Sequence, residues 1–232
     1  MNIIVALEVP RAKCKPQMNL QPMIDRNGNP VRSSAAQQRI RKAALELFAE
    51  KGAASVTISE LAAAAGVVRG TIYKNVTSPE LLFETIAEQL SDEMTRQVVK
   101  SYASVDDPAA RLAIAIRLYV RRAHDEPHWG RFLIRFSMTN PSLRMFWSGP
   151  PAHDLALGVQ SGRYDLKAEQ LPSALAMIAG STLGAIVLVL DGMRTWRDAG
   201  TEVATMVLRA LGLSKEQAEE ISARSLPDLA EP

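Results

Sequence analysis

The chain has 232 residues, of which 47% are hydrophobic and 22% charged, with a net charge of only +2. This length allows one large or two small domains, and the hydrophobic content suffices for a sizeable core. Many Ala and Leu residues, few aromatics and no long run of alternating β-branched residues favour an all-α fold over one that contains a sheet. The single cysteine, Cys14, excludes an internal disulfide and fits a reducing cytoplasm.

Residues 1–32 are expected to form a flexible N-terminal arm, with a turn cluster at 26–30. The apolar stretch 1–9 lacks a basic start and a cleavage site, so it does not qualify as a signal peptide. Met1, Met18 and Met23 are all possible start residues, and the sequence does not choose among them.

A predicted amphipathic helix spans 39–52 and ends at Gly52. Thr57, with Glu60 three residues later, forms a capping-box pattern for the next helix. In the helix 39–52, apolar positions recur every three to four residues: Ile40, Ala43, Ala44, Leu47 and Phe48.

The most informative segment is 58–75, ISELAAAAGVVRGTIYKN. Ala62 is small enough to lie where two helices cross, and Gly66 permits the positive φ that a tight turn needs. Ile72 falls on the inner face of the second helix, from which it can pack on the first. This spacing is typical of a helix-turn-helix, whose second helix enters the major groove, so we predict that the chain binds DNA.

Basic residues concentrate around this segment, since residues 26–76 hold eight Lys or Arg against three Asp or Glu. A solvated basic face is the alternative, but the coincidence with a helix-turn-helix favours phosphate contact. Arg69 is placed to bond guanine, Thr71 to meet thymine, and Tyr73 and Lys74 to reach phosphate; Asn75 suits either role. An alternative for Tyr73 is packing against the first helix, and capping alone accounts for Thr57. The predicted DNA-binding residues are Arg39, Thr57, Ser59, Val68, Arg69, Gly70, Thr71, Tyr73, Lys74 and Asn75.

Further helices are predicted along the rest of the chain, and Ser78-Pro79-Glu80 marks the start of the first of them. The predicted spans are 78–100, 108–125, about 128–139, 142–161 with a bend at 149–151, 167–194, 198–211 and 214–224, followed by a tail at 226–232.

Roughly, residues 36–95 specifically resemble the TetR family of transcriptional repressors, and the rest of the chain resembles it only in architecture. Val68, Asn75-Val76 and Pro79 depart from the usual family residues, and Pro79 removes one phosphate contact. The resemblance implies a helix-turn-helix DNA-binding domain at 33–77 and a larger helical effector-binding and dimerisation domain at 78–225. It also implies a homodimer that an effector releases from operator DNA. The matching residues are 39–52, 57–62, 65–67 and 70–73.

Residues 170–190 carry no charge and contain Gly180 and Gly184 four apart, a spacing also found in membrane helices. Pro172, two serines and a threonine dilute the run, and no basic flank follows, so a helix at a subunit interface is the better interpretation. A membrane-anchored regulator is the weaker alternative. The predicted dimer interface comprises Ala176, Gly180, Gly184, Val203, Met206, Val207 and Ala210.

Large apolar side chains gather within 129–147, beside a proline break. Each one alone suits a core, but together they suggest a cavity for an apolar or aromatic effector, to which Arg131 or Arg135 could add a carboxylate contact. The alternative is a C-terminal domain that only dimerises and binds no small ligand. The predicted effector-binding residues are Trp129, Phe132, Phe136, Met138, Met145, Phe146, Trp147 and Met177.

No enzyme motif is present, and no cofactor is expected. His124 and His128 have the spacing of zinc ligands on one helix, but Pro127 breaks that helix, so no metal site is predicted. The sequence thus predicts a cytoplasmic, ligand-responsive transcriptional repressor. It names neither the operator nor the effector.

Overall fold

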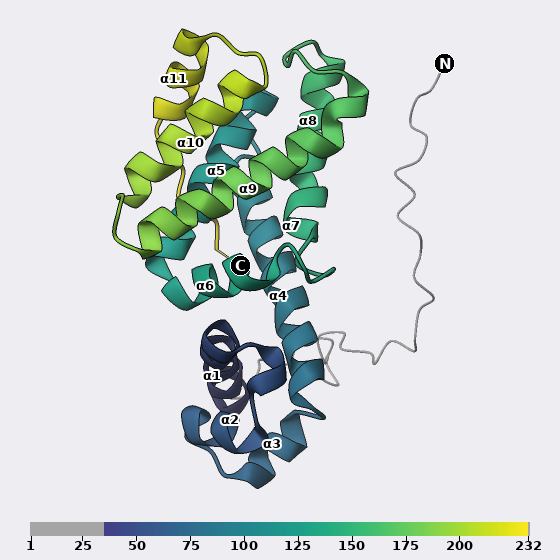
Figure 1. Ribbon diagram of the computed structural model, residues 1–232, viewed down its shortest axis with the longest axis vertical. Helices are drawn as coiled ribbons and strands as arrows, with labels where there is room; N and C mark the ends of the chain where they lie inside the picture. The colour runs from purple at the N-terminus through teal and green to yellow at the C-terminus, as the bar shows by residue number, and fades with distance from the viewer. Residues whose placement is uncertain (1–34, 232) are drawn as a thin grey trace.

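The structure is a computed structural model that describes residues 35–231, and the predicted all-α fold is confirmed: every regular element in this range is helical. Helices α1 to α3 form a small domain at one end, which we call the reading domain. The long α4 leads from it into a larger helical domain, which we call the effector domain after the role predicted for it (Figure 1). The elements are α1 (Ala35–Lys51), η1 (Ala53–Ser55), α2 (Ile58–Ala65), α3 (Arg69–Asn75), α4 (Pro79–Ser101), α5 (Pro108–Asp125), α6 (Pro127–Phe136), α7 (Met145–Ser148), α8 (Pro150–Gln160), η2 (Ala168–Gln170), α9 (Leu171–Leu190), α10 (Trp196–Ala210) and α11 (Lys215–Ala223).

The reading domain follows the local signals of its sequence. Thr57 and Glu60 form the predicted capping box at the start of α2. Gly66 ends α2 with φ 61° and ψ 41°, the left-handed conformation that glycine adopts at little cost. Ala62, at the helix crossing, is buried, and Ile72 is completely buried against the same core as Leu61. The helix-turn-helix is therefore present at the predicted residues.

The segment 142–161 differs from its prediction as one bent helix. The Asn140 side chain accepts hydrogen bonds from the backbone N–H groups of Ser142 and Leu143, and this local turn delays the next helix. The four-residue α7 then ends, and α8 begins anew with Pro150, which supplies no backbone N–H. The bend at 149–151 is thus a complete break between two helices.

Two hydrophobic clusters form the core. The first runs without interruption from the reading domain through α4 into α5, α6, α7 and α9. The second joins α5 to α8, α9, α10 and α11. Because the first cluster crosses the domain junction, the reading domain packs against the effector domain through apolar side chains. Residues 1–32 of the predicted arm, and the first two residues of the predicted DNA-binding domain, lie outside the described residues.

Candidate nucleic-acid interface and effector site

The helix α3 is held on the reading domain by a single fully buried side chain, that of Ile72. The sides of α3 that do not face the core are exposed to solvent. Val68, the N-cap, is 74% exposed, and Tyr73 is 67% exposed. The alternative in which Tyr73 packs against the first helix is therefore wrong. An exposed, short helix that is anchored on one side presents its polar face to a ligand as large as DNA.

The ten predicted DNA-binding residues all lie on one domain, and nine of them are exposed. Thr71 is half-buried and its carbonyl accepts a 2.7 Å hydrogen bond from the Asn75 side-chain amide. This bond fixes the Asn75 side chain along α3 and leaves the amide oxygen as an acceptor. The exposed residues are Arg39, Thr57, Ser59, Val68, Arg69, Gly70, Tyr73, Lys74 and Asn75.

The capping box at the start of α2 is reinforced by an ion pair from α1. The Lys51 ammonium lies 2.7 Å from Glu60, whose other oxygen accepts from the Thr57 backbone and hydroxyl. The Lys51 hydrogen bond and those from Thr57 lower the pKa of Glu60 to about 2. Thr57 is thus occupied by helix capping, and its hydroxyl contributes to the position of α2 within the reading domain.

A cavity lies in the effector domain where α4 and α5 meet the start of α8. Its volume open to a water-sized molecule is about 10 Å³, room for about one water. Asp154, buried in its wall, accepts hydrogen bonds from the Tyr102 hydroxyl at 3.1 Å and from Arg111 at 3.2 Å. Burial, together with the Asp154 charge, raises the pKa of Tyr102, so its phenol stays protonated and donates. The lining residues are Thr95, Val98, Val99, Tyr102, Leu112, Ala115, Tyr119, Pro150, Pro151 and Asp154.

One polar atom in this wall is left over. The Thr95 hydroxyl is buried and has no hydrogen-bond partner. A buried hydroxyl without a partner costs free energy, which a bound molecule that offers a donor or acceptor would recover. The cavity therefore combines apolar walls, a fixed carboxylate and one free hydroxyl. Sequence reasoning missed this set, because its members are up to 59 residues apart along the chain, from Thr95 to Asp154.

The aromatic residues predicted for an effector site divide into two groups. Phe132 and Phe136 pack on Phe83 at the domain junction, with ring centroids 5.4 and 4.8 Å away. Trp129, Phe146 and Trp147 surround Tyr119 instead, and Tyr119 is the member of this group that lines the cavity.

The other predicted effector residues lie elsewhere. Met138 is 54% exposed, and the Met145 side chain lies outside what the structure describes. Met177 packs against the second core cluster and lines an open hollow of about 240 Å³ on α9 and α10. Met177 is therefore separate from the aromatic residues with which it was grouped, because α9 crosses both core clusters.

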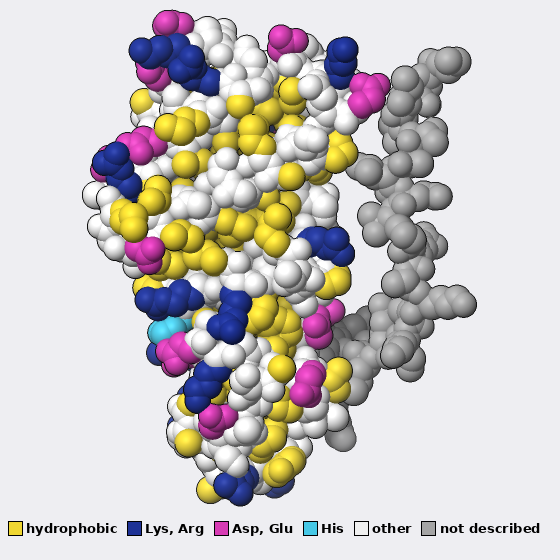
Figure 2. Space-filling view, in the orientation of Figure 1, with side chains coloured by type: hydrophobic (Ala, Val, Ile, Leu, Met, Phe, Trp, Pro, Cys, Tyr) yellow, Lys and Arg dark blue, Asp and Glu magenta, His cyan; other side chains and the backbone are white. Residues whose placement is uncertain are grey.

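The helix α9 turns one side outward. Ala176, Gly180 and Gly184 are exposed, and a Cβ built on either glycine would meet no other atom within 4 Å. Figure 2 shows apolar side chains gathered along the diagonal of α9, with charged side chains at the edges of this face. The described chain from Ala168 to Leu190 is apolar enough to span a membrane, and 39% of its most apolar window is buried inside the subunit.

The α10 residues predicted for the interface have different positions. Met206 and Ala210 are exposed and lie on the outer side of α10, and Val203 is half-buried. Val207 is only 2% exposed and belongs to the second core cluster. Its inclusion in a dimer interface is a wrong prediction, because the apolar stripe of α10 has an inner side that faces α5 and α9.

Together, a helix-turn-helix with an exposed second helix and a larger helical domain joined to it define a helix-turn-helix DNA-binding regulator. The family model described as "Tetracyclin repressor-like, C-terminal domain" matches residues 107–224, and that of "Bacterial regulatory proteins, tetR family" matches 40–86. The chain belongs to the TetR family of transcriptional regulators.

Known relatives agree with this assignment. An uncharacterized HTH-type transcriptional regulator of Mycobacterium tuberculosis (strain H37Rv) is 31% identical over 112 residues, which cover 48% of this chain. The match covers 54% of that relative, so the chain spans about half the length of the curated relatives it matches.

Solved structures extend the similarity over both domains. RolR in complex with resorcinol is 28% identical, with a TM-score of 0.64 over 84% of this chain and 96% of RolR. FadR from Bacillus subtilis in complex with stearoyl-CoA is 19% identical, with a TM-score of 0.62 over 76% of this chain and 99% of FadR. The second similarity establishes the fold alone.

Proposed function

We propose that this chain is a cytoplasmic transcriptional repressor that binds operator DNA as a homodimer through α3 and leaves it when a small effector binds the effector domain. The single observation that carries the proposal is the exposed face of α3 on a helix-turn-helix whose geometry is complete. Arg69 stands at the N-terminal end of α3, where base edges are met, and Lys74 stands near its C-terminal end.

The proposed homodimer forms through α9 and α10. The outward side of α9 carries the small residues Ala176, Gly180 and Gly184, so a second helix can approach its backbone closely there. Two copies that pack α9 and α10 against each other would form a four-helix bundle and cover the apolar face in Figure 2. Such burial also removes the need to place α9 in a membrane. Two reading helices in one molecule would then bind two half-sites together.

The proposed effector is a small, mostly apolar molecule, aromatic in type, that enters the cavity lined by Tyr102, Tyr119 and Asp154. The chain is 28% identical to RolR, whose structure contains resorcinol, which makes a small phenol the first compound to test. Because the cavity has room for about one water, such a molecule must push α4 away from α5 or α8. Effector binding and movement of α4 are thereby linked. A ligand that prefers the state in which α4 has moved away from α5 or α8 shifts the population toward that state.

A second candidate function is a dimeric DNA-binding protein without a small ligand. The observation that favours it is the tight packing of Trp129, Phe132 and Phe146, each 1% exposed. In this candidate the cavity beside Tyr119 is an ordinary packing defect, and the C-terminal domain serves dimerisation only.

The two candidates are separated by operator binding measured with and without resorcinol. The operator is first selected from a random DNA pool, and its affinity for the full chain is then followed by fluorescence anisotropy. A regulator of the proposed kind loses affinity as resorcinol or a related phenol is added, and its thermal midpoint rises with ligand concentration. Unchanged affinity across a panel of small phenols and apolar acids would favour the second candidate.

A variant of the cavity wall identifies the binding place. Thr95→Val removes the buried hydroxyl at nearly constant volume, and we expect it to weaken the response to a hydroxylated ligand several-fold. The matched control is Thr85→Val on the same helix, whose hydroxyl donates to the Leu81 carbonyl near the surface and does not line the cavity. Equal responses of the two variants would place the effector elsewhere.

A further inference from the structure

The reading domain is attached to the effector domain at two places along α1. Near the C-terminal end, the guanidinium of Arg135 on α6 donates to the carbonyl oxygens of Glu50 at 2.9 Å and of Ala49 and Lys51 at 3.3 Å. These carbonyls lie in the last turn of α1, where no intrahelical donor remains for them. Arg135 therefore caps α1 from the neighbouring domain.

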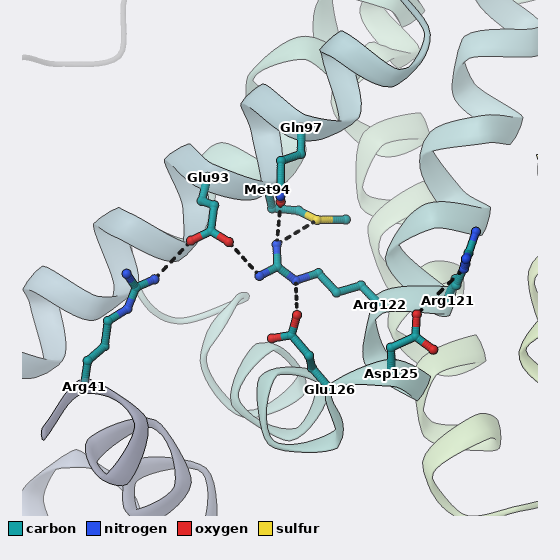
Figure 3. A network of polar contacts seen from close by, with 8 residues as sticks. All are labelled: Arg41, Glu93, Met94, Gln97, Arg121, Arg122, Asp125 and Glu126. Carbon is teal, nitrogen blue, oxygen red and sulfur yellow. Dashed lines mark hydrogen bonds and ion pairs between the residues drawn. The ribbon is translucent and has the colours of Figure 1, made fainter. Parts of the chain in front are cut away.

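A second attachment lies near the middle of α1, at Arg41, and depends on one carboxylate. Glu93 of α4 receives a hydrogen bond on one oxygen from Arg41 of α1, at 3.1 Å. Its other oxygen receives a hydrogen bond from Arg122 of α5, at 3.0 Å. Figure 3 shows the carboxylate between the two guanidinium groups, which come from different domains. Burial opposes the ionisation of Glu93, but Arg122 and Arg41 outweigh it and hold the pKa of Glu93 below its usual value.

Arg122 is fixed more firmly than Arg41. Its side chain is 6% exposed, whereas that of Arg41 is 42% exposed. Arg122 also donates to the Gln97 side chain at 2.9 Å and lies 5.1 Å from the centroid of the Trp129 ring. It forms a further ion pair with Glu126 at 3.3 Å. A guanidinium with this many partners holds one orientation, so Glu93 transfers the position of α5 to α1.

The same network touches the wall of the effector cavity. Trp129, on which Arg122 lies, has its ring centroid 6.0 Å from that of Tyr119, which lines the cavity. On α4, the cavity residue Val98 directly follows Gln97, which accepts from Arg122. A molecule that displaces α4 at the cavity therefore also displaces the groups that orient Glu93.

We propose that Glu93 is a positioning residue whose carboxylate fixes the angle between the reading domain and the effector domain, and with it the separation of the two reading helices in the homodimer. This inference rests on the proposed function, because half-site separation matters only to a dimer that binds DNA. Arg41 is the partner that transmits this angle to α1. The effector would act on the separation through the contacts of Arg122.

The test compares operators that differ only in the distance between half-sites. The selected operator, versions with one base pair inserted or removed at its centre, and a single half-site are measured with the wild type and with Glu93→Gln. We expect Glu93→Gln to reduce the preference for the native spacing about three- to tenfold. Affinity for the single half-site should stay within about twofold, because α3 itself is unchanged.

Arg41→Gln tests the same bridge from its exposed end, where loss of the fold is not expected, and Arg41→Lys should restore part of the spacing preference. The control is Arg121→Gln, since Arg121 neighbours Arg122 on α5 but pairs with Asp125 and Asp228 rather than with α1. Unaltered spacing preference in both Glu93→Gln and Arg41→Gln would overturn the inference. A wild type that binds no selected operator would instead refute the proposed function.

The distance between the two reading helices can also be measured without DNA, as an independent test. With Cys14→Ser in the background, a spin label at Lys74→Cys reports the distance between the two reading helices of a dimer, because Lys74 is exposed. We expect Glu93→Gln to broaden this distance distribution and Arg121→Gln to leave it unchanged. Equal distributions for Glu93→Gln and the wild type would count against the positioning role.

Discussion

Replacement of Ile72 by Ala should detach the reading helix while the effector domain stays folded. Ile72 is the only buried residue of the seven-residue α3, and none of its surface is exposed. Removal of a fully buried Ile side chain to Ala costs about 2–5 kcal/mol. A domain of this size is stable by roughly 2–7 kcal/mol in total, so the loss is comparable to everything that holds it together. The docked state of α3 then becomes a fraction of the population, and operator affinity falls by that fraction.

Two measurements separate this effect from general unfolding. Hydrogen exchange of the peptide 69–75 should accelerate strongly in Ile72→Ala, while the peptides of α5 and α10 keep wild-type protection. Operator affinity, measured by anisotropy, should fall at least tenfold. Ile72→Val is the matched control, since its cost of about 0.5–1.5 kcal/mol leaves most of the docked state intact. Wild-type operator affinity for Ile72→Ala, with the peptide still protected, would refute the single-anchor argument.

Three further predictions follow from the two domains. Arg69→Ala should cost about 1–3 kcal/mol and relax preference at particular base pairs, whereas Lys74→Ala should weaken all sequences alike and reduce the salt slope by about one; unchanged preference would remove Arg69 from base readout. Gly184→Leu fits the single subunit, where its Cβ meets nothing within 4 Å, but should separate the dimer in sedimentation; a fully dimeric variant would place the interface elsewhere. The Lys51 and Thr57 hydrogen bonds lower the pKa of Glu60 to about 2, so its contribution to stability is present above about pH 4 and is lost as the pH falls toward 2. The thermal midpoints of wild type and Glu60→Gln should therefore converge on acidification, and a constant difference would contradict the assignment.

The reading domain could be predicted from the sequence because its determinants are local. Thr57 and Glu60 are three residues apart. Gly66 indicates a left-handed backbone conformation, because glycine lacks the Cβ atom that disfavours it. Pro79 likewise marks the first turn of α4 without reference to the rest of the chain. Each of these signals acts within one helical turn, so no knowledge of the tertiary structure is needed to interpret it.

The effector domain could be predicted only in outline. A dense group of aromatic side chains suits a core and a ligand cavity equally well, and the choice depends on which helices approach each other. Tyr102 meets Asp154 across 52 residues, and Arg135 reaches the α1 carbonyls across 84 to 86 residues. Contacts at such separations leave no periodic pattern in the sequence, so the cavity and the bridge at Glu93 emerge only from the fold.

Selection of DNA by the full chain from a random pool tests whether α3 reads a DNA sequence. We expect enrichment of a sequence with two inverted half-sites, which match the two-fold symmetry of a homodimer whose reading helices enter successive major grooves. Arg69→Ala should select a related sequence that has lost preference at one or two positions of each half-site. A pool without any enriched sequence would contradict the assignment of α3 as the reading helix. Selection of the same sequence by the wild type and by a variant whose α3 is replaced by alanines would contradict it as well.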